Sequence, residues 1–272
     1  MPELPEVETV RRSLEPVIIG RRIVSIEFRR CDLRWTIDRS AFEQRVVGHK
    51  VSALRRRGKF LLFELANATV FLVHLGMSGR LGLFQTQDSF EPHTHVVFFL
   101  DQDLELRYRD PRRFGFLQIV NSGESAVSLD CLGVEPLSDD FTAEVLGEIA
   151  GSSKRSIKNV LLDGRAIAGL GNIYTCESLF YAGIDPFRTA VELDRSEIDR
   201  LTRAIKDVLR AAVQKGGTTL LDFRNALGEP GFFQFDLAVY GRSGSACRCC
   251  GRAVERVVQN GRSTYYCPVC QK

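Results

Sequence analysis

The chain has 272 residues, of which 44% are hydrophobic and 26% charged, and its formal net charge is +3; this composition excludes a disordered chain and leaves room for two domains. Its first ten residues, MPELPEVETV, hold three glutamates where a signal peptide needs basic residues and an apolar run, and no apolar stretch is long enough to span a bilayer. We therefore expect a cytoplasmic protein with no membrane partner.

The first predicted element is a helix over Pro5–Leu14. Proline suits a first helical turn, Glu6 and Glu8 lie near the positive end of the helix, and one face is apolar, with Val7, Val10 and Leu14. An acidic start of this kind can simply cap the helix. That interpretation fits Glu6, but we do not expect it for Pro2 and Glu3, which precede the helix.

Residues 21–120 have the pattern of β-strands. Five segments alternate or run apolar with β-branched and aromatic enrichment, namely RRIVSIEF, KFLLFEL, TVFLVHL, HVVFFL and LELRYR. Turn signals at Arg57-Gly58, Ala66-Asn67 and residues 101–103 separate them. Many short strands at hairpin spacing predict an antiparallel sandwich or barrel. His93 and His95 precede one strand on a shared face, and since no third ligand is evident we interpret them as structural.

The chain becomes helical beyond a boundary near residues 131–138, which read CLGVEPLS. Asp194 to Glu197 form a predicted capping box for a long helix that ends at Gly216-Gly217. Two shorter helices between Ile157 and Ala182 are joined by Gly169-Leu170-Gly171-Asn172. A glycine pair there fits a plain tight connection as well as a backbone that approaches a phosphate. The predicted fold class is therefore α+β.

Four cysteines near the end of the sequence have the spacing of a structural zinc site, Cys247-x2-Cys250-x16-Cys267-x2-Cys270. Four protein ligands leave no open coordination position, so we expect one zinc ion with a structural role and no part in catalysis. Cys249 is interpreted as a bystander, and Cys31, Cys131 and Cys176 as small buried apolar residues.

The same C-terminal segment is basic. From residue 240 onward six basic residues face one acid, so this segment carries +5 and the rest of the chain −2. Such asymmetry favours a polyanionic partner, although a solvated basic hairpin would look the same.

Seven blocks distributed over the whole chain, in order, resemble the formamidopyrimidine-DNA glycosylase family: MPELPEVETVRR, RRRGKFLLFEL, HLGMSGRL, DPRRFGF, GLGNIYTCESLF, YGRSGSACRCC and GRSTYYCPVCQ. The resemblance implies an N-terminal antiparallel β-sandwich with flanking helices over residues 1–130, which carries catalysis. It also implies a helical domain with a helix-two-turns-helix motif and a lesion-capping loop over 131–235, and a zinc-ribbon hairpin over 236–272.

The resemblance further implies a bifunctional DNA glycosylase and abasic-site lyase, and the residues suit that chemistry. Once Met1 is removed, Pro2 presents a terminal secondary amine, and such amines titrate near neutral pH, so a useful fraction is nucleophilic. It would attack C1′ of the damaged nucleotide, and the resulting iminium would permit β- and δ-elimination. Glu3 would be general acid and base at the sugar. Lys59 and Arg262 would bind phosphates beside the lesion and assist catalysis, although a basic run on a hairpin is often only a solvated edge.

Three residues match the family's side chains that fill the space left by a flipped base: Met77, Arg112 and Phe114. All three follow turn signals and not apolar runs, so we expect them to be exposed. The expected DNA-binding set also includes His93, Lys158 and Asn172. The segment 216–231, GGTTLLDFRNALGEPG, matches the loop that closes over the damaged base, and its terminal glycines suit a mobile lid.

Two alternatives remain open at this point. An enzyme of the endonuclease VIII type shares this architecture but prefers oxidised pyrimidines; Leu4, the pair Arg112 and Phe114, and the complete 216–231 loop favour the purine-directed branch. A non-catalytic zinc-ribbon protein is the other alternative, against which Pro2 and its acidic neighbour argue. We expect a monomer whose partner is double-stranded DNA with an oxidised purine opposite cytosine, encountered at the nucleoid.

Overall fold

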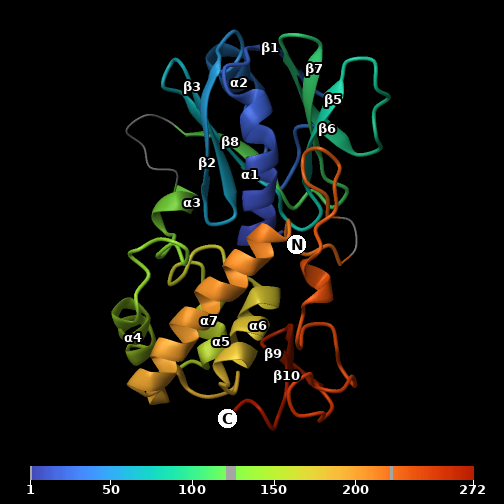
Figure 1. Cartoon of the computed structure of the whole chain (residues 1–272). Helices are drawn as coiled ribbons and strands as arrows, with labels where there is room; N and C mark the ends of the chain where they lie inside the picture. Colours follow the sequence, from blue (N-terminus) through green and yellow to red (C-terminus); the bar gives the residue numbers. More distant parts are fainter. Residues whose placement is uncertain (1, 121–126, 221–222) are drawn as a thin grey trace. The chain divides into compact units, whose positions relative to one another are not determined.

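The computed structural model describes residues 2–120, 127–220 and 223–272, which belong to two compact units (Figure 1). Unit 1 comprises residues 1–130 and 215–232, and unit 2 comprises residues 131–214 and 233–272. The chain thus leaves unit 1 after residue 130, returns to it with the segment 215–232, and leaves it again for the rest of unit 2. The division into domains 1–130, 131–235 and 236–272 shares the first of these boundaries and otherwise stays a prediction.

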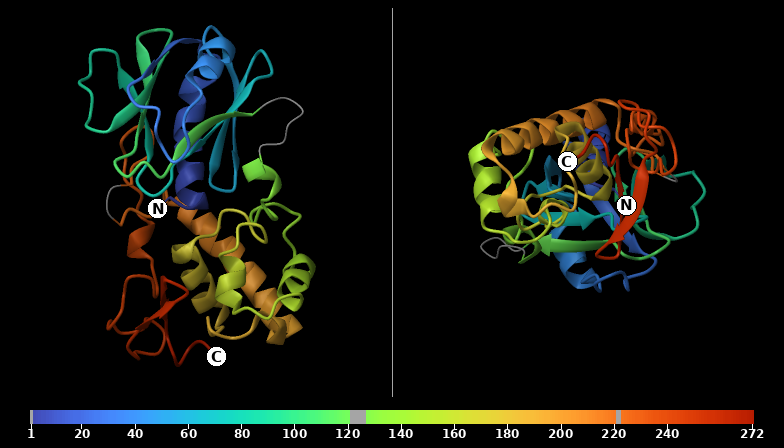
Figure 2. Two further views of the ribbon diagram at one scale, coloured as in Figure 1. Left: turned by 180° about the vertical axis from the view of Figure 1, so that it is seen from behind. Right: turned by 90° about the horizontal axis from the view of Figure 1, so that it is seen from below.

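Unit 1 is built on two four-stranded antiparallel sheets (Figure 2, left). The first has the order β1-β6-β7-β5, with bounds Ile23–Phe28, Thr94–Leu100, Leu104–Arg109 and Arg80–Gln85. The second has the order β2-β3-β4-β8, with bounds Val51–Arg57, Phe60–Leu65, Val70–His74 and Phe116–Val120. The five predicted strand segments are confirmed as β1, β3, β4, β6 and β7. Strands β2, β5 and β8 lie within the predicted strand region 21–120 but outside the five quoted segments; arginines in β2 and Gly82 in β5 interrupt the apolar pattern.

Aromatic side chains join the two sheets into one core. Phe71 of β4 stacks on Phe63 of β3 at 4.6 Å between ring centroids, and on Phe98 of β6 in the other sheet at 5.4 Å. All three rings are fully buried. Because Phe71 and Phe98 come from different sheets, their contact confirms the predicted sandwich.

Two helices flank this core, α1 over Leu4–Ile18 and α2 over Arg39–Arg45. Helix α1 is four residues longer at its C-terminal end than predicted, because its apolar face continues to Ile18, which is fully buried. Phe42 anchors α2 by an edge contact with Phe71 at 5.7 Å. A single turn of helix, α3 over Val127–Asp130, completes the described helices of unit 1.

Unit 2 contains four α-helices and one β-hairpin among its described residues (Figure 1). The helices are α4 Ala143–Gly151, α5 Ile157–Leu161, α6 Asn172–Ala182 and α7 Arg195–Gln214; the hairpin pairs β9 Glu255–Gln259 with β10 Arg262–Tyr266. Two 3-10 turns, η1 Ala190–Glu192 and η2 Phe233–Phe235, lie in the connections. Together with the sandwich of unit 1, these helices and this hairpin confirm the α+β fold class.

Local signals placed the longest helix of unit 2 correctly. The backbone N–H of Asp194 donates to Glu197 Oε2 at 2.9 Å, and the N–H of Glu197 donates to Asp194 Oδ1 at 2.9 Å, so the predicted capping box is present. The connection between α5 and α6 contains Gly169 at φ +85°, and Gly171 is the N-cap of α6. The two short helices and their glycine turn are therefore confirmed.

In the part of the chain that the structure describes, no helix combines the length and apolar character that a bilayer crossing requires.

Candidate functional site

Unit 1 opens with a pair of buried carboxylates. Glu3 is 3% exposed and Glu6 is 2% exposed, and they form a reciprocal capping box at the start of α1, with the Glu3 N–H donating to Glu6 Oε2 at 2.8 Å. The expectation that Glu3 does not cap the helix is therefore wrong. Pro2, which is half-buried, directly precedes this box. The capping box thus fixes the place of the Glu3 side chain, one residue after Pro2.

The β2–β3 hairpin carries Lys59 next to a half-buried histidine. Two of the arginines before Lys59 form salt bridges, Arg55 with Glu64 at 2.7 Å and Arg56 with Glu8 at 3.1 Å. Burial and then the charge of Lys59 lower the pKa of His74 to about 4. His74 is therefore neutral at physiological pH, and its Nδ1 accepts the Gly76 N–H at 3.1 Å. The basic run is thus not a uniform solvated edge.

Two neighbouring turns present large exposed side chains. Met77 is 42% exposed and Phe114 45% exposed, and the guanidinium of Arg112 lies 4.7 Å above the Phe114 ring. The predicted exposure of this group is confirmed. An apolar thioether, a phenyl ring and a guanidinium on one surface form a wedge with hydrogen-bonding capacity, which suits insertion between stacked bases.

The two histidines at the start of β6 do not behave alike. His93 precedes the strand, is exposed and has φ +67°, whereas His95 lies within the strand, is 5% exposed and has its Nε2 hydrogen-bonded to the Asp110 carbonyl at 2.9 Å. The expectation that they share a face is therefore wrong. The structural interpretation holds for His95, and the DNA-binding role of His93 stays a prediction.

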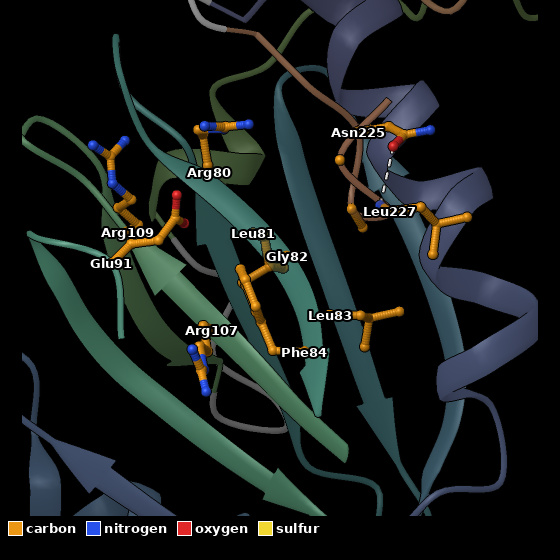
Figure 3. A pocket seen from close by; sticks show the side chains of 12 residues that line it. Arg80, Leu81, Gly82, Leu83, Phe84, Glu91, Arg107, Arg109, Asn225 and Leu227 are labelled. Carbon is orange, nitrogen blue, oxygen red and sulfur yellow. Dashed lines mark hydrogen bonds between the residues drawn. The ribbon is translucent and has the colours of Figure 1, made fainter. Parts of the chain in front are cut away.

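The segment 216–231 is fastened in unit 1 at both ends, and its residues 221 and 222 lie outside the described part of the chain. Near its start, the Thr218 N–H donates to Glu6 Oε1 at 2.7 Å. Near its end, the Ala226 carbonyl accepts the Leu83 N–H of β5 at 2.9 Å. Beside this junction lies a pocket of about 120 Å³ lined by Arg80, Glu91 and Arg109 among others (Figure 3).

In unit 2 two polar residues hold the strand that begins with Arg262. Lys158 is fully buried and its Nζ donates to Ser263 O at 3.1 Å and to Thr264 Oγ1 at 2.7 Å, while Asn172 Nδ2 donates to Ser263 O at 2.7 Å. Burial lowers the pKa of Lys158. Arg262 itself is exposed. The resemblance assigned Lys158 to the DNA-binding set, whereas the structure buries it and bonds it to Ser263 and Thr264 of the hairpin strand.

The four predicted ligand cysteines converge. Their sulfur atoms all lie within 4.8 Å of one another, with Cys247 and Cys270 at 3.8 Å and Cys250 and Cys267 at 3.5 Å. Tetrahedral zinc with Zn–S bonds of about 2.3 Å requires S–S separations of about 3.8 Å, so the donor set fits one structural zinc ion. Cys249 is exposed and only its backbone N–H contacts this group, at 3.5 Å from Cys247 Sγ.

The remaining cysteines correct part of the sequence interpretation. Cys176 is buried as predicted and packs in the small core beneath the zinc ligands, but Cys131 is exposed and Cys31 is only half-buried. No disulfide joins any of the eight cysteines.

Sequence reasoning missed two buried acids that organise these elements. Asp110 is fully buried at the end of β7, and Glu177 of α6 accepts backbone N–H groups from Ala238, Val239 and Tyr240 at 2.7 to 3.0 Å. Burial raises the pKa of Glu177. Neither residue has a sequence signal beyond its position in a quoted block, since DPRRFGF contains Asp110 and GLGNIYTCESLF contains Glu177.

A proline followed by two buried glutamates, an exposed wedge, and helices that support a four-cysteine hairpin are the features of a zinc-finger enzyme that processes DNA. The chain matches the formamidopyrimidine-DNA glycosylase N-terminal domain over residues 1–117, the H2TH domain of the same enzymes over 132–223, and the zinc finger found in FPG and IleRS over 244–272. The chain belongs to the formamidopyrimidine-DNA glycosylase family.

Relatives and solved structures agree over the full length. The chain is 45% identical to the formamidopyrimidine-DNA glycosylase of Rhodopseudomonas palustris and 46% identical to that of Geobacillus kaustophilus, with 100% of each chain covered. The MutM (FPG) protein of Thermus thermophilus matches with a TM-score of 0.90 at 43% identity, covering 99% of this chain and 98% of that one. A Lactococcus lactis FPG mutant in complex with DNA containing Fapy-dG matches with a TM-score of 0.93 at 34% identity, with both chains fully covered.

Proposed function

We propose that this protein excises oxidised purines, 8-oxoguanine and formamidopyrimidines, from duplex DNA and then cleaves the abasic strand. The observation that carries the proposal is the placement of Pro2 directly before the buried Glu3–Glu6 box. A terminal secondary amine supplies the nucleophile of a covalent glycosylase, and a buried acid beside it supplies the proton donor and acceptor. The Lactococcus lactis relatives bound to Fapy-dG DNA and to DNA with an abasic site support both the substrate and the product.

The reaction begins at the sugar of the flipped nucleotide. With Met1 removed, the lone pair of the Pro2 nitrogen attacks C1′ and the bond to the base breaks, with a proton supplied to the leaving group. Glu3 is the proton donor and acceptor at the sugar. Opening of the sugar ring then breaks the C1′–O4′ bond, with a proton delivered to O4′, and leaves a covalent iminium between C1′ and the Pro2 nitrogen. The iminium makes the C2′ proton acidic, so its removal expels the 3′ phosphate by β-elimination. A second, δ-elimination expels the 5′ phosphate, and water then hydrolyses the iminium and releases the sugar fragment from Pro2.

The other residues bind and shape the DNA. In this proposal Lys59 and Arg262 contact phosphates beside the flipped nucleotide and assist the eliminations, and the bonds from Asn172 and Lys158 to Ser263 order the strand that carries Arg262. Met77, Arg112 and Phe114 fill the space that the base leaves, with the Arg112 guanidinium as the group that can hydrogen-bond the orphaned cytosine. His93 contacts the same duplex, and the 216–231 loop covers the damaged base.

Zinc supports this arrangement without taking part in the chemistry. Cys247, Cys250, Cys267 and Cys270 hold one ion whose four positions are filled by sulfur, so it supplies the small hairpin with the stability that its minimal apolar core lacks. We further propose that the protein acts as a monomer in the cytoplasm, at the chromosomal DNA.

A nicking assay with two duplexes tests this proposal. Duplex with 8-oxoguanine opposite cytosine and duplex with thymine glycol are incubated with the protein, and strand cleavage is followed on a denaturing gel. Preferential cleavage of the 8-oxoguanine strand, with both 3′ and 5′ phosphate ends, is expected. Preference for thymine glycol would favour the pyrimidine-directed alternative, and no cleavage of either duplex would favour a non-catalytic binding protein.

A further inference from the structure

A single fully buried carboxylate connects the two turns that carry the exposed wedge. Asp110 Oδ1 accepts the Ser78 hydroxyl at 2.6 Å, and its Oδ2 accepts the Gly115 N–H at 2.8 Å. Ser78 follows Met77, and Gly115 follows Phe114. The two oxygens of one side chain thus reach the immediate neighbours of two wedge residues that lie far apart in the sequence.

Further bonds extend this connection to the other residues of the DNA-facing surface. The Arg112 N–H lies 3.3 Å from Asp110 Oδ1 and 3.2 Å from Ser78 Oγ, and the Tyr108 hydroxyl lies 3.3 Å from Asp110 Oδ2. The backbone N–H of Asp110 donates to the His93 carbonyl at 3.1 Å. Among the described residues Asp110 forms no salt bridge, so hydrogen-bond donors from the turns surround it in place of a cation.

Glycines let the two turns come close enough for this arrangement. A Cβ at Gly76 would collide with the backbone of Phe114 and Gly115, and one at Gly115 would collide with the His74 carbonyl and the Tyr108 hydroxyl. Gly76 also has φ +60°. The turns are therefore packed backbone to backbone, and the Asp110 carboxylate is the polar group that fixes their relative position.

We propose that Asp110 is a positioning residue that holds the Met77 turn and the Arg112–Phe114 turn as one preformed wedge. This inference rests on the proposed function and deepens it: Asp110 sets the rate at which a base is extruded from duplex DNA and the discrimination of the opposite base by Arg112. Without this fixed arrangement, each turn would have to be ordered on the DNA, and the free energy of that ordering would be lost from binding.

A purely structural role for Asp110, as an anchor at the end of β7, makes a different prediction. Anchoring a strand would affect every activity of the protein in parallel. Positioning the wedge affects only steps that need a base to leave a duplex, and a preformed abasic site in single-stranded DNA needs no such step. The comparison of these two substrates therefore separates the two roles.

Two substitutions test the proposal, Asp110→Asn and Ser78→Ala. The amide of asparagine cannot accept hydrogen bonds on both of its side-chain atoms, so one turn loses its partner. Ser78→Ala removes the two bonds of the Ser78 hydroxyl, to Asp110 and to the Arg112 N–H, and leaves Asp110 in place, so it carries the test if the buried substitution prevents folding. Asp101→Asn, in the turn at the opposite end of β6 and β7, is the matched control.

The measurements are single-turnover excision of 8-oxoguanine from duplex and borohydride trapping on a single-stranded abasic oligonucleotide. We expect both test variants to excise 8-oxoguanine at least about tenfold more slowly than the wild type, since each loses a hydrogen bond of the Asp110 carboxylate. Trapping should stay within about twofold, as should both activities of Asp101→Asn. The ratio of excision opposite cytosine to excision opposite adenine should fall in both test variants.

Trp35 provides a readout in the absence of DNA. It is the only tryptophan in the sequence, its ring lies 4.1 Å from Phe116, and the N–H of the preceding residue, Arg34, donates to the Gly115 carbonyl at 3.2 Å. Loosening of the 112–115 turn should increase acrylamide quenching of Trp35 in Asp110→Asn, but not in Asp101→Asn.

Excision within about twofold of the wild type in Ser78→Ala and in folded Asp110→Asn would overturn the proposal. Excision and trapping that fall in the same proportion would also overturn it, in favour of the structural role. A wild-type protein that neither excises nor traps would instead contradict the proposed function, so the two failures are distinguishable.

Discussion

Glu6 accepts a hydrogen bond from the backbone N–H of Thr218 at 2.7 Å, although 212 positions separate the two residues in the sequence. The other oxygen of the same carboxylate accepts the Glu3 N–H at 2.8 Å. The start of the chain and the base of the 216–231 segment are therefore held by one buried group, and a displacement at either end is transmitted to the other.

Gly217 offers a direct test of this connection. It has φ +79°, and a Cβ there would lie 2.8 Å from Glu6 Oε1, so Gly217→Ala should displace the carboxylate and slow base excision by about tenfold or more. Gly228→Ala is the matched control, because Gly228 has a similar φ of +85° but nothing within 4 Å of its Cβ. Both alanines are strained alike, so equal single-turnover excision rates in the two variants would disprove the connection.

Removing zinc should disable DNA binding without unfolding unit 1. The hairpin has only a small apolar core around Cys247 and Cys267, so its order depends on the metal. We expect about one zinc ion per chain in a metal-release assay, and a loss of DNA affinity of at least about tenfold in Cys250→Ser. Cys249→Ser should retain both zinc and affinity; loss of zinc in that variant would mean that the ligand set is misassigned.

The exposed Arg262 should account for part of the salt dependence of DNA binding. Replacement of one phosphate-contacting arginine by alanine lowers the slope of log K against log salt by about one unit. Arg262→Ala should show this decrease, measured by fluorescence anisotropy over a salt series, whereas Arg39→Ala on α2 should keep the wild-type slope. An undiminished slope in Arg262→Ala would show that this arginine contacts no phosphate.

His74 should make the stability of unit 1 fall in mild acid. Its folded pKa of about 4 lies below the ordinary 6.5, so below pH 6.5 the unfolded chain binds a proton that the folded chain refuses. This contribution is fully present above the unfolded pKa and is lost progressively as the pH falls toward 4. Between pH 7 and pH 5 it amounts to about 2 kcal/mol.

Urea unfolding followed by Trp35 emission measures this contribution, because the only tryptophan lies in unit 1. His74→Asn keeps an acceptor for the Gly76 N–H but does not titrate, so its stability should depend less steeply on pH than that of the wild type. Identical pH profiles for the two proteins would place the acid sensitivity elsewhere.

Features with local signals were predictable from the sequence, and those that depend on distant partners were not. The Asp194–Glu197 capping box and the two Cys-x2-Cys pairs are each defined by residues close together in the sequence, and both predictions are confirmed. Strand β5 could not be found in this way, because Gly82 interrupts its pattern and its partner residues in β7 lie 19 to 29 positions later.

The same distinction applies to the site. The sequence alone gives no reason for Lys158 to be buried, and its bonds to Ser263 and Thr264, more than a hundred residues later, supply that reason. Asp110 likewise has the sequence pattern of an ordinary turn residue before Pro111. Its proposed positioning role depends on its hydrogen bond with Ser78, 32 positions earlier. The nucleophile and the wedge were accessible from the sequence only through the resemblance to the family, because no spacing rule identifies an N-terminal proline as reactive.

The identity of the covalently trapped residue tests the central claim most directly. The protein is incubated with an 8-oxoguanine duplex in the presence of borohydride, and the adduct is digested and mapped by mass spectrometry. We expect the reduced sugar on the nitrogen of Pro2 at the processed N-terminus, and strongly reduced trapping in Pro2→Gly with retained binding of damaged duplex. An adduct on any other residue, such as Lys59, in fully active protein would contradict the mechanism.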